Sequence, residues 1–517
     1  MTGGGLQALI AYGSQNVLLS GNPQITYFYK AFKRYSHFAM ESITIPLEGP
    51  NELSFDQPIQ LRAKIPRYGD LLTDLIFTFT VPDIYSKYMA PKDGRTSQWE
   101  FQWVQYLGAA IIRNAALFIG GQKIQEFDGS YLLSRALLDA DQDAFLKWKY
   151  LVGDTPELTE PALGAYAGGT THTGYPSVYE DPTRLNLQQL NRPSIFGRDI
   201  HIPLSFWFTE TPSQALPLIG LQYHECEVQL TLNPISSLYT VLDMSGNRVA
   251  PNYKMNASES QMHQNTPNYV ASSDIHSQIR YFFTDFGYTP PALNSWFINP
   301  IIQGTFIYLP KEEQQIFASR PLSYMISQVT AYPFPGQYTR QVLDLQTHNP
   351  LTRLIFIQRR SDSVARNDFA NFTNWYTYPF SPFLPTPNIL TSLQQGSTSG
   401  LLIPNAQQDI IRAIRVICDG NEIQELKNVD YFTRISTYRY TKGIGQEGLP
   451  IYSFQLGQSP NQASGSINAS RIRNFQVDVD VFPLPTNTTY TYDIFIYVEN
   501  INWLEIVSGM GGLKFAL

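Results

Sequence analysis

The chain has 517 residues, a length that suits two domains of about 200 residues or more better than one core. Its net charge is −7 and no run of lysine and arginine occurs, which argues against direct binding to nucleic-acid phosphates. The only cysteines, Cys226 and Cys418, exclude a disulfide scaffold and are typical of small hydrophobic side chains on strands.

The composition favours β structure. Charged residues make up 15% of the chain, against roughly a quarter in average soluble proteins, and aromatic residues reach 14%. This balance suits strands packed face to face and surfaces that neighbouring molecules cover. A β-rich monomer with an uncharged surface is the plainer interpretation.

Residues 1–29 carry no charge and form the first distinct segment. A secretory signal needs a basic start and a longer apolar core than LQALIAYG, so we expect no signal peptide. A second uncharged stretch, 369–408, is too rich in Pro, Asn, Gln, Ser and Gly to span a bilayer. The sequence therefore predicts a soluble, unsecreted protein.

Strand patterns dominate the rest of the chain. The stretch LIFTFTV, residues 75–81, places alternate apolar residues on one face. Residues 475–481 alternate apolar residues with polar ones that include Asp478 and Asp480, which predicts a strand with an outward polar face. The stretch TYDIFIYV, which ends at Val498, is apolar on both faces and predicts a central strand.

Few helices are expected, and they are short. Pro310, followed by Glu312 and Glu313, is a typical helix start that leads into apolar residues. Residues 130–150 are a second candidate helical region. The chain is therefore predicted to be all-β with a few short helices.

An internal repeat predicts that the fold is duplicated. Residues Ile111–Phe127 align without gaps on Ile410–Leu426, with seven of seventeen positions identical. Each copy has a two-residue turn between strand patterns, Gly-Gly at 120–121 and Asp-Gly at 419–420, and both pairs are typical of type I′ hairpins. The same hairpin is therefore predicted twice.

A second match follows in the same order. Residues 205–215 align on 453–463 at five of eleven positions, and an alternating strand follows each copy. The first copy is longer between its two matches, and most of the extra residues fall in 151–200, where Gly, Thr, Tyr and Pro cluster. This composition predicts a long surface loop. Residues 239–300 form another polar insert.

No motif in the sequence predicts catalytic, cofactor or metal chemistry. The glycines of G-x-G-x-x-G at 443–448 precede Leu449-Pro450 and a strand, so no phosphate-binding helix can start there. His224, Glu225 and Cys226 adjoin one another, but neighbours on a strand point to opposite faces and cannot share a metal. We therefore expect a protein that is not an enzyme.

Sequons of the N-x-[ST] type mark four candidate glycosylation sites. The one at 256 lies in a polar insert and is the most accessible candidate, and the one at 487 lies in a predicted turn. Four matches are near the number that chance produces in a chain rich in Asn, Ser and Thr. The four residues are Asn256, Asn371, Asn468 and Asn487.

Distinctive stretches in both halves carry a family resemblance. In the first half these are AYGSQNVLLSGNPQITYF, FAMESI, RYGDLL, FIGGQKI, IPLSFWF and ALPLIGLQYHE. In the second half they are FIYLPKEEQQIFA, HNPLTRLIFI, IYSF, SGSINASRI and VSGMGGL. On these residues the chain closely resembles the major capsid proteins of nucleocytoplasmic large DNA viruses.

The resemblance implies a double jelly roll, that is, two eight-stranded β-sandwiches in tandem with long inserted loops. It further implies homotrimers, the capsomers, that have a pseudo-hexagonal outline and tile the icosahedral shell of a virion assembled in the host cytoplasm. The implied partners are neighbouring capsomers and minor capsid and penton proteins, over an internal membrane that the protein does not span. No cofactor and no direct nucleic-acid contact are implied.

Repeat and resemblance together divide the chain into four parts. We expect an N-terminal arm at 1–25, a first jelly roll at 26–238 with its loop insert at about 151–200, a polar inter-domain insert at 239–300 and a second jelly roll at 301–517. The arm is either a frayed tail or, as the resemblance suggests, an ordered segment on the inner face of the shell that touches minor capsid proteins.

The main alternative function is that of a carbohydrate-binding, lectin-like sandwich, because lectins share this architecture. Trp375, Tyr376 and Tyr378 form a dense aromatic cluster that could serve as a sugar platform. Phe380 and Phe383 beside it favour a packed loop instead. An enzymatic sandwich is a third alternative, and the missing motifs argue against it.

Overall fold

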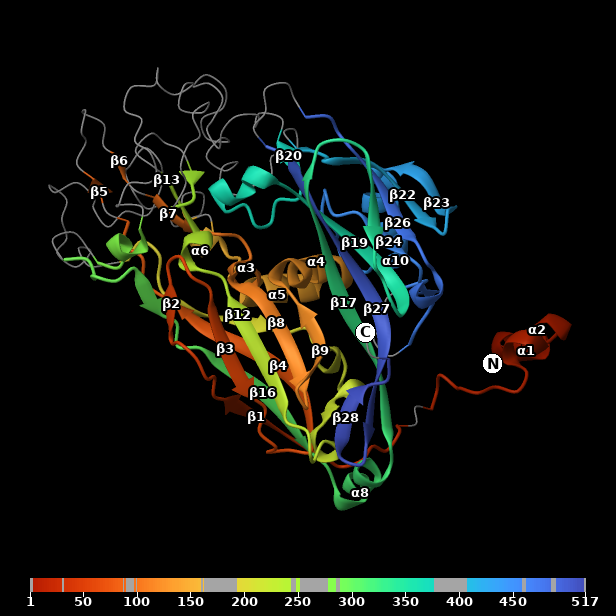
Figure 1. Cartoon of the computed structure of the whole chain (residues 1–517). Helices are drawn as coiled ribbons and strands as arrows, with labels where there is room; N and C mark the ends of the chain where they lie inside the picture. The colour runs from red at the N-terminus through yellow and green to blue at the C-terminus, as the bar shows by residue number, and fades with distance from the viewer. Residues whose placement is uncertain are drawn as a thin grey trace.

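The computed structural model describes residues 3–29, 32–86, 88–89, 97–98, 100–159, 161, 193–242, 248–251, 278–284, 289–375, 407–457, 462–484 and 490–515. Two β-sandwiches stand side by side, with two helices at the junction between them (Figure 1). These helices are α4 (Gly129–Asp139) and α5 (Gln142–Leu151). They confirm the helical region expected at 130–150.

The first sandwich consists of two antiparallel sheets. One has the order β1 (Ala39–Ile45), β16 (Ile301–Tyr308), β4 (Leu71–Val81) and β10 (Arg198–Pro203), with β11 (Leu216–Pro217) also on β4. The other has the order β3 (Ile59–Lys64), β12 (Cys226–Leu232), β8 (Ile112–Ile119) and β9 (Gln122–Phe127). Along the chain the strands alternate between the two sheets, as in a jelly roll, except that β8 and β9 form a hairpin within one sheet and β10 and β11 both pair with β4 in the other.

The second sandwich repeats this order strand for strand. Its first sheet runs β17 (Leu322–Gln337), β27 (Tyr492–Val507), β19 (Pro350–Arg360), β24 (Ile451–Ser453), with β25 (Ile467–Asn468) on β19 and β28 (Met510–Leu513) on β27. Its second sheet runs β18 (Gln341–Leu345), β26 (Phe475–Val481), β22 (Ile411–Cys418), β23 (Asn421–Asn428). The predicted duplication into two jelly rolls is confirmed.

The repeated hairpins have the predicted turns. In the first copy Gly120 and Gly121 have φ of 58° and 80°, and in the second Asp419 and Gly420 have φ of 48° and 80°. Positive φ at both central residues is the type I′ geometry that follows the twist of the flanking strands.

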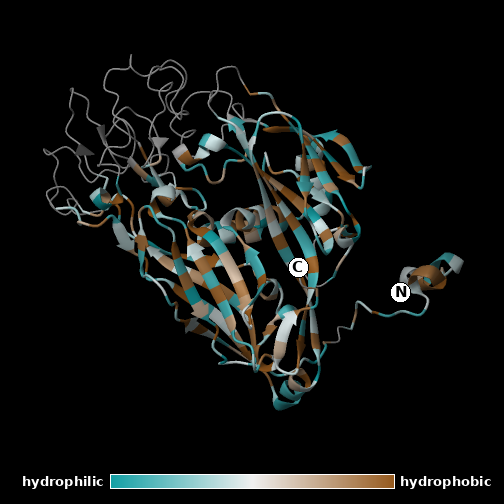
Figure 2. Cartoon of the chain, viewed as in Figure 1, coloured by the Kyte–Doolittle hydropathy of each residue, from teal (hydrophilic) through white to brown (hydrophobic). Residues whose placement is uncertain are grey.

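Alternating strands bury one face as predicted. Along β4, Leu75, Phe77, Phe79 and Val81 are all buried in the first core, and alternating hydropathy along the strands of this sandwich is visible in Figure 2. Strand β27 pairs with β17 on one side and β19 on the other, which confirms its central place. Both cysteines are free and buried, on β12 and β22.

Two expectations from the sequence are wrong. Strand β16 pairs with β1 and β4, so it is a central strand of the first sandwich and a boundary at 301 is misplaced. The polar insert separates β16 from β12 in the chain, and only the sheet pairing reveals where the strand belongs. The face of β26 that carries Asp478 and Asp480 is not open to water, because arginine side chains cover both carboxylates.

Smaller elements complete the fold. The helix expected at Pro310 is α8 (Lys311–Ser319), with Pro310 at its N-cap. Among the described residues the other α-helices are α1 (Gly4–Ile10), α2 (Ser14–Ser20), α3 (Leu107–Ile111), α6 (Pro156–Thr159) and α10 (Ser436–Tyr440), and a π-helix (Tyr431–Ile435) precedes α10. The remaining strand pairs are β2 (Glu52–Ser54) with β15 (Ser295–Phe297), β13 (Tyr239–Leu242) with β7 (Glu100–Trp103) and β14 (Arg248–Val249), β5 (Tyr88–Met89) with β6 (Ser97–Gln98), and β20 (Asn374–Trp375) with β21 (Gln407–Gln408).

Candidate functional site

A buried ionic cluster joins the two sandwiches. Arg353 on β19 donates two hydrogen bonds to Asp139 at the end of α4, at 2.6 and 2.9 Å. It donates two more to Glu499 on β27, both at 2.8 Å. Tyr131 of α4 donates a hydrogen bond of 2.7 Å to the same Glu499. One guanidinium therefore holds a carboxylate of each sandwich.

The electrostatics of this cluster depend on the arginines. Burial by itself acts to raise the pKa of Asp139, but the charges and hydrogen bonds of Arg353 and Arg135 outweigh it and hold the pKa below its ordinary value. The side chain of Arg353 is only 1% exposed. A buried arginine without its carboxylates would carry the full cost of desolvation. Arg353 therefore favours the arrangement of the two sandwiches in which both carboxylates reach it.

A second contact fixes the start of α4. Asp128 caps the helix by accepting a hydrogen bond from the backbone N–H of Tyr131 at 2.8 Å, and it also accepts one from the hydroxyl of Tyr497 on β27 at 2.6 Å. The rings of Tyr131 and Tyr497 stack with centroids 5.9 Å apart. Both ends of α4 are thus bound to the second sandwich.

The glycine-rich turn at 443–448 holds the far end of α4. The backbone N–H groups of Gly443 and Gly445 donate to the carbonyls of Leu138 and Leu137, at 2.7 and 3.0 Å. A Cβ at Gly443 would lie 2.2 Å from the carbonyl oxygen of Leu137. The turn therefore needs glycine for close backbone contact, and, as predicted from the sequence, no helix follows it.

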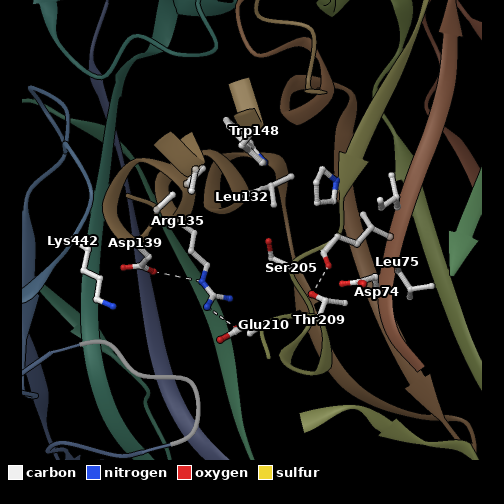
Figure 3. A pocket seen from close by; sticks show the side chains of 16 residues that line it. Asp74, Leu75, Leu132, Arg135, Asp139, Trp148, Ser205, Thr209, Glu210 and Lys442 are labelled. Atoms are coloured by element: carbon white, nitrogen blue, oxygen red, sulfur yellow. Dashed lines mark hydrogen bonds and ion pairs between the residues drawn. The ribbon is translucent and has the colours of Figure 1, made fainter. Parts of the chain in front are cut away.

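A pocket of about 500 Å³ opens beside α4 and α5 (Figure 3). Arg135 lies in it between Asp139, at 3.5 Å from Nε, and Glu210, at 2.5 Å from Nη2. Burial raises the pKa of Glu210, although Arg135 opposes this shift. Asp74 and Lys442 line the pocket from opposite sides, one from each sandwich. Its central charges are already paired with one another, an arrangement suited to joining elements rather than to proton transfer.

The N-terminal arm is a large apolar surface outside the sandwiches. Helices α1 and α2 have no buried residue and lie well away from both sandwiches (Figures 1 and 2). Monomeric proteins rarely leave so many large apolar side chains in water. The exposed large apolar side chains of the arm and of the segment that links it to β1 are Leu6, Leu9, Ile10, Tyr12, Val17, Leu18, Leu19, Ile25, Tyr27, Phe28, Tyr29, Phe32, Tyr35 and Phe38.

The outer edge of the second sandwich is also open. In the first copy, Ile124 on β9 is 1% exposed, and Gln328 of β17 donates a hydrogen bond of 2.5 Å to its carbonyl. The equivalent residue of the second copy, Ile423 on β23, is 41% exposed. The same edge strand is therefore covered in one copy and bare in the other.

The candidate glycosylation sites differ in accessibility. Asn371 is 4% exposed and accepts hydrogen bonds from Thr373, so the folded chain does not offer it to an enzyme. Asn468 is exposed and caps a short turn through Ser470. Asn256 and Asn487 lie outside the described residues, as do most of the 151–200 insert and the aromatic cluster from Tyr376 onwards.

No metal or membrane chemistry emerges from the described part of the chain. It contains no group of three or more His, Cys, Asp or Glu placed to hold a metal ion. Of the His224–Cys226 triplet only Cys226 belongs to a strand, so the expectation of one strand segment there is wrong in part. None of the described helices is long and apolar enough to cross a bilayer.

Comparisons with known proteins agree with this architecture. The family profile described as "Major capsid protein N-terminus" matches residues 26–271, and the one described as "Large eukaryotic DNA virus major capsid protein" matches residues 313–512. The chain belongs to the major capsid proteins of large DNA viruses. Together the two profiles match most of both sandwiches.

Relatives and solved structures extend over nearly the whole chain. The major capsid proteins of Chrysochromulina ericina virus and Paramecium bursaria Chlorella virus 1 are each 25% identical over 99% of this chain and 100% and 99% of their own lengths. PBCV-1 VP54 is 20% identical, with a TM-score of 0.64 over 95% of this chain and all of its own. The Faustovirus major capsid protein is 12% identical, with a TM-score of 0.64 over 97% of this chain and 96% of its own. These two structures share the double jelly-roll fold, and the comparisons do not support the lectin-like alternative.

The central residues of the junction were missed from the sequence. Asp139 and Glu499 lie 214 and 146 positions from Arg353, too far apart for any local pattern to connect them. One signal was present: Arg353 interrupts the apolar strand stretch LTRLIF, and a charge at such a position needs a buried partner.

Proposed function

We propose that three copies of this capsid protein form a homotrimeric capsomer with a pseudo-hexagonal outline, and that these capsomers tile an icosahedral shell. The observation that carries this proposal is the identical strand order of the two sandwiches. A hexagonal lattice needs six similar units around each capsomer, and three chains with two equivalent sandwiches provide six under threefold symmetry.

The bare edge of the second sandwich supports the same proposal. A chain that covers β9 with its own β17 but leaves β23 open has one satisfied edge and one unsatisfied edge. Chains joined head to tail through the open edge close into a ring when the rotation between them is a third of a turn.

Mass and shape test the trimer. Light scattering on the purified protein is expected to give a mass three times 58.7 kDa, and electron micrographs are expected to show six-sided particles. A monodisperse monomer at high protein concentration would contradict the proposal.

We propose further that the apolar N-terminal arm docks on the inner face of the shell, against minor capsid proteins above an internal membrane. The support is its row of exposed apolar side chains, which neither sandwich covers. Deletion of residues 2–20 is expected to leave trimers intact and to impair shell assembly in infected or co-expressing cells. Normal shells built from the truncated protein would contradict this role.

Assembly in the host cytoplasm, contacts with penton proteins and the lack of an enzymatic activity fit a protein whose work is self-assembly through large complementary surfaces. Of the sequons on described residues, Asn468 is the exposed one, so mass spectrometry of virion protein is expected to find any glycan there rather than at Asn371.

A further inference from the structure

The junction inside the chain predicts the junction between chains, residue by residue. In the aligned strands LTDLIF (72–77) and LTRLIF (351–356), the one difference places Asp74 where the second copy has Arg353. Arg353 is the residue that binds α4 of the first sandwich through Asp139. The equivalent position on the first sandwich therefore carries the opposite charge.

The helix that follows the edge strand differs in the same way. Phe127 pairs with Ala115 in the first copy, and Lys427 pairs with Ile414, the equivalent of Ala115, in the second. Up to this point equivalent residues of the two hairpins are 299 positions apart. One additional bulge in β23 adds a residue, so later positions correspond at a spacing of 300, which also aligns Tyr131 with Tyr431. At this spacing Asp139, the partner of Arg353, corresponds to Arg439.

Both charges of the internal pair are therefore reversed in the open surfaces. We infer that Arg439 of one chain pairs with Asp74 of the next chain in the capsomer, as a charge-reversed replica of the Asp139–Arg353 pair. This inference rests on the trimer proposed above and specifies its contact. Arg439 and Asp74 are both exposed, and within the described residues neither has an ion-pair partner.

The surroundings of Arg439 support an interface. Leu138 of α4 is fully buried at the internal junction, whereas its equivalent on α10, Tyr438, is 89% exposed. Ile435, on the same turn region, is 44% exposed. A large aromatic and an aliphatic side chain beside an arginine are the composition typical of the centre of a protein interface.

The receiving surface is bare as well. Strand β1 of the first sandwich occupies the place that β17 has in the second, since both lie beside the equivalent strands β16 and β27. Residues 39–42 of β1 are exposed, and Met40 is 63% exposed. The β23 edge of one chain therefore fits against β1 of a second copy, as β9 fits against β17 within the chain.

The reversed charges also give specificity. If the pair between chains had the same orientation of charges as the pair within the chain, either helical segment could bind either sandwich. With opposite signs, α4 meeting Asp74 would oppose two carboxylates, and the helix at 431–440 meeting Arg353 would oppose two arginines. Such like-charge contacts are strongly unfavourable at an interface.

Charge reversal tests the pair. Arg439→Asp and Asp74→Arg are each expected to raise the concentration at which half of the trimer dissociates by at least about tenfold, because three contacts per ring become repulsive. The double variant is expected to return to the wild-type value. Arg320→Asp, at the far end of α8, is the matched control and is expected to leave the value unchanged.

A crosslink keeps the test decisive if a charge variant folds poorly. The double variant Asp74→Cys/Arg439→Cys, treated with a short bis-maleimide, is expected to give bands at two and three times the chain mass, and each single variant only the monomer band. Both native cysteines are buried and should not react.

These experiments distinguish failure of the Asp74–Arg439 pair from failure of the trimer. A trimeric wild type whose single reversals dissociate normally, or a double variant that fails to recover or to crosslink, would overturn the Asp74–Arg439 pair and leave the trimer standing. A monomeric wild type would overturn the capsomer proposal itself.

Discussion

Arg353 shows how one side chain can bind two domains. It satisfies carboxylates from both sandwiches, and its own charge is almost entirely withdrawn from water. Buried ion pairs contribute little net stability when intact, but removing one partner leaves the others buried and unpaired. The cluster therefore acts mainly by penalising every arrangement in which the sandwiches are displaced.

Arg353→Met is expected to lower the free energy of unfolding by ~3–5 kcal/mol, because Asp139 and Glu499 lose their counter-charge while remaining buried. Lys64→Met is the matched control, since its pair with Glu225 is exposed on both sides and is expected to contribute at most ~1 kcal/mol. Chemical denaturation of both variants measures the difference. Equal losses for the two would argue against a special role for the cluster.

Asp409 predicts a pH dependence. Burial, followed by the nearby charges of Glu447 and Asp430, raises its pKa from 3.8 to about 6. The folded chain thus holds this proton more tightly than the unfolded chain, so the stabilisation is complete below the ordinary pKa and is lost as the pH rises through about 6. Asp409→Asn is expected to melt higher than the wild type at pH 7.5 and equally at pH 4. A constant difference across this range would contradict the assignment.

At the scale of elements, α4 is the piece on which the junction depends. It begins at the end of edge strand β9, its cap residue and its last residue both bind the second sandwich, and the 443–448 turn holds its final carbonyls. The equivalent helical segment of the second copy, 431–440, buries one face but leaves Ile435, Tyr438 and Arg439 exposed. The two copies thus differ in how far the helical segment after the edge strand is covered.

Gly443→Ala is expected to destabilise the protein by ~1–3 kcal/mol, because the new Cβ would overlap the carbonyl of Leu137 and push the turn from α4. Gly457→Ala, which meets nothing within 4 Å, is the control and should change the melting temperature little. If the two alanine variants melted alike, the turn would not be a close backbone contact.

At the scale of the molecule, the two sandwiches share their largest core. The main hydrophobic cluster runs from the first sandwich into Ile355, Ile357, Tyr497 and Leu504 of the second, and a separate cluster fills the interior of the second. Domains that share a core in this way lose it together when they separate.

The shared core predicts one cooperative thermal transition for the full chain in scanning calorimetry. Arg353→Met is expected to move this single peak to lower temperature rather than split it. Two well-separated peaks in the wild type would show that the sandwiches unfold independently and would contradict the shared-core account.

Much of the fold was predictable from the sequence because the determinants are local. Alternation along 75–81 needs only the period of a strand, and the Gly-Gly and Asp-Gly turns need only positive φ at two residues. The duplication was visible because the equivalent hairpins still share seven of seventeen residues. The major capsid protein family followed from stretches spread over both halves.

The site was less predictable, for two reasons. The first is that strand pairing can cross a long insert, as it does for β16. The second is that side chains from other strands decide which charges are buried, as Arg340 and Arg415 do for Asp478. The sequons showed the same limit, since the accessibility of Asn371 was decided by packing.

By itself, the sequence determined that this protein holds two copies of one jelly roll, because turn geometry and strand periodicity act between neighbours in the chain. Only the tertiary structure decided which edge of each copy is covered and which charge meets Arg353. Those outcomes depend on the desolvation of groups that are hundreds of residues apart in the chain, and no local pattern records them.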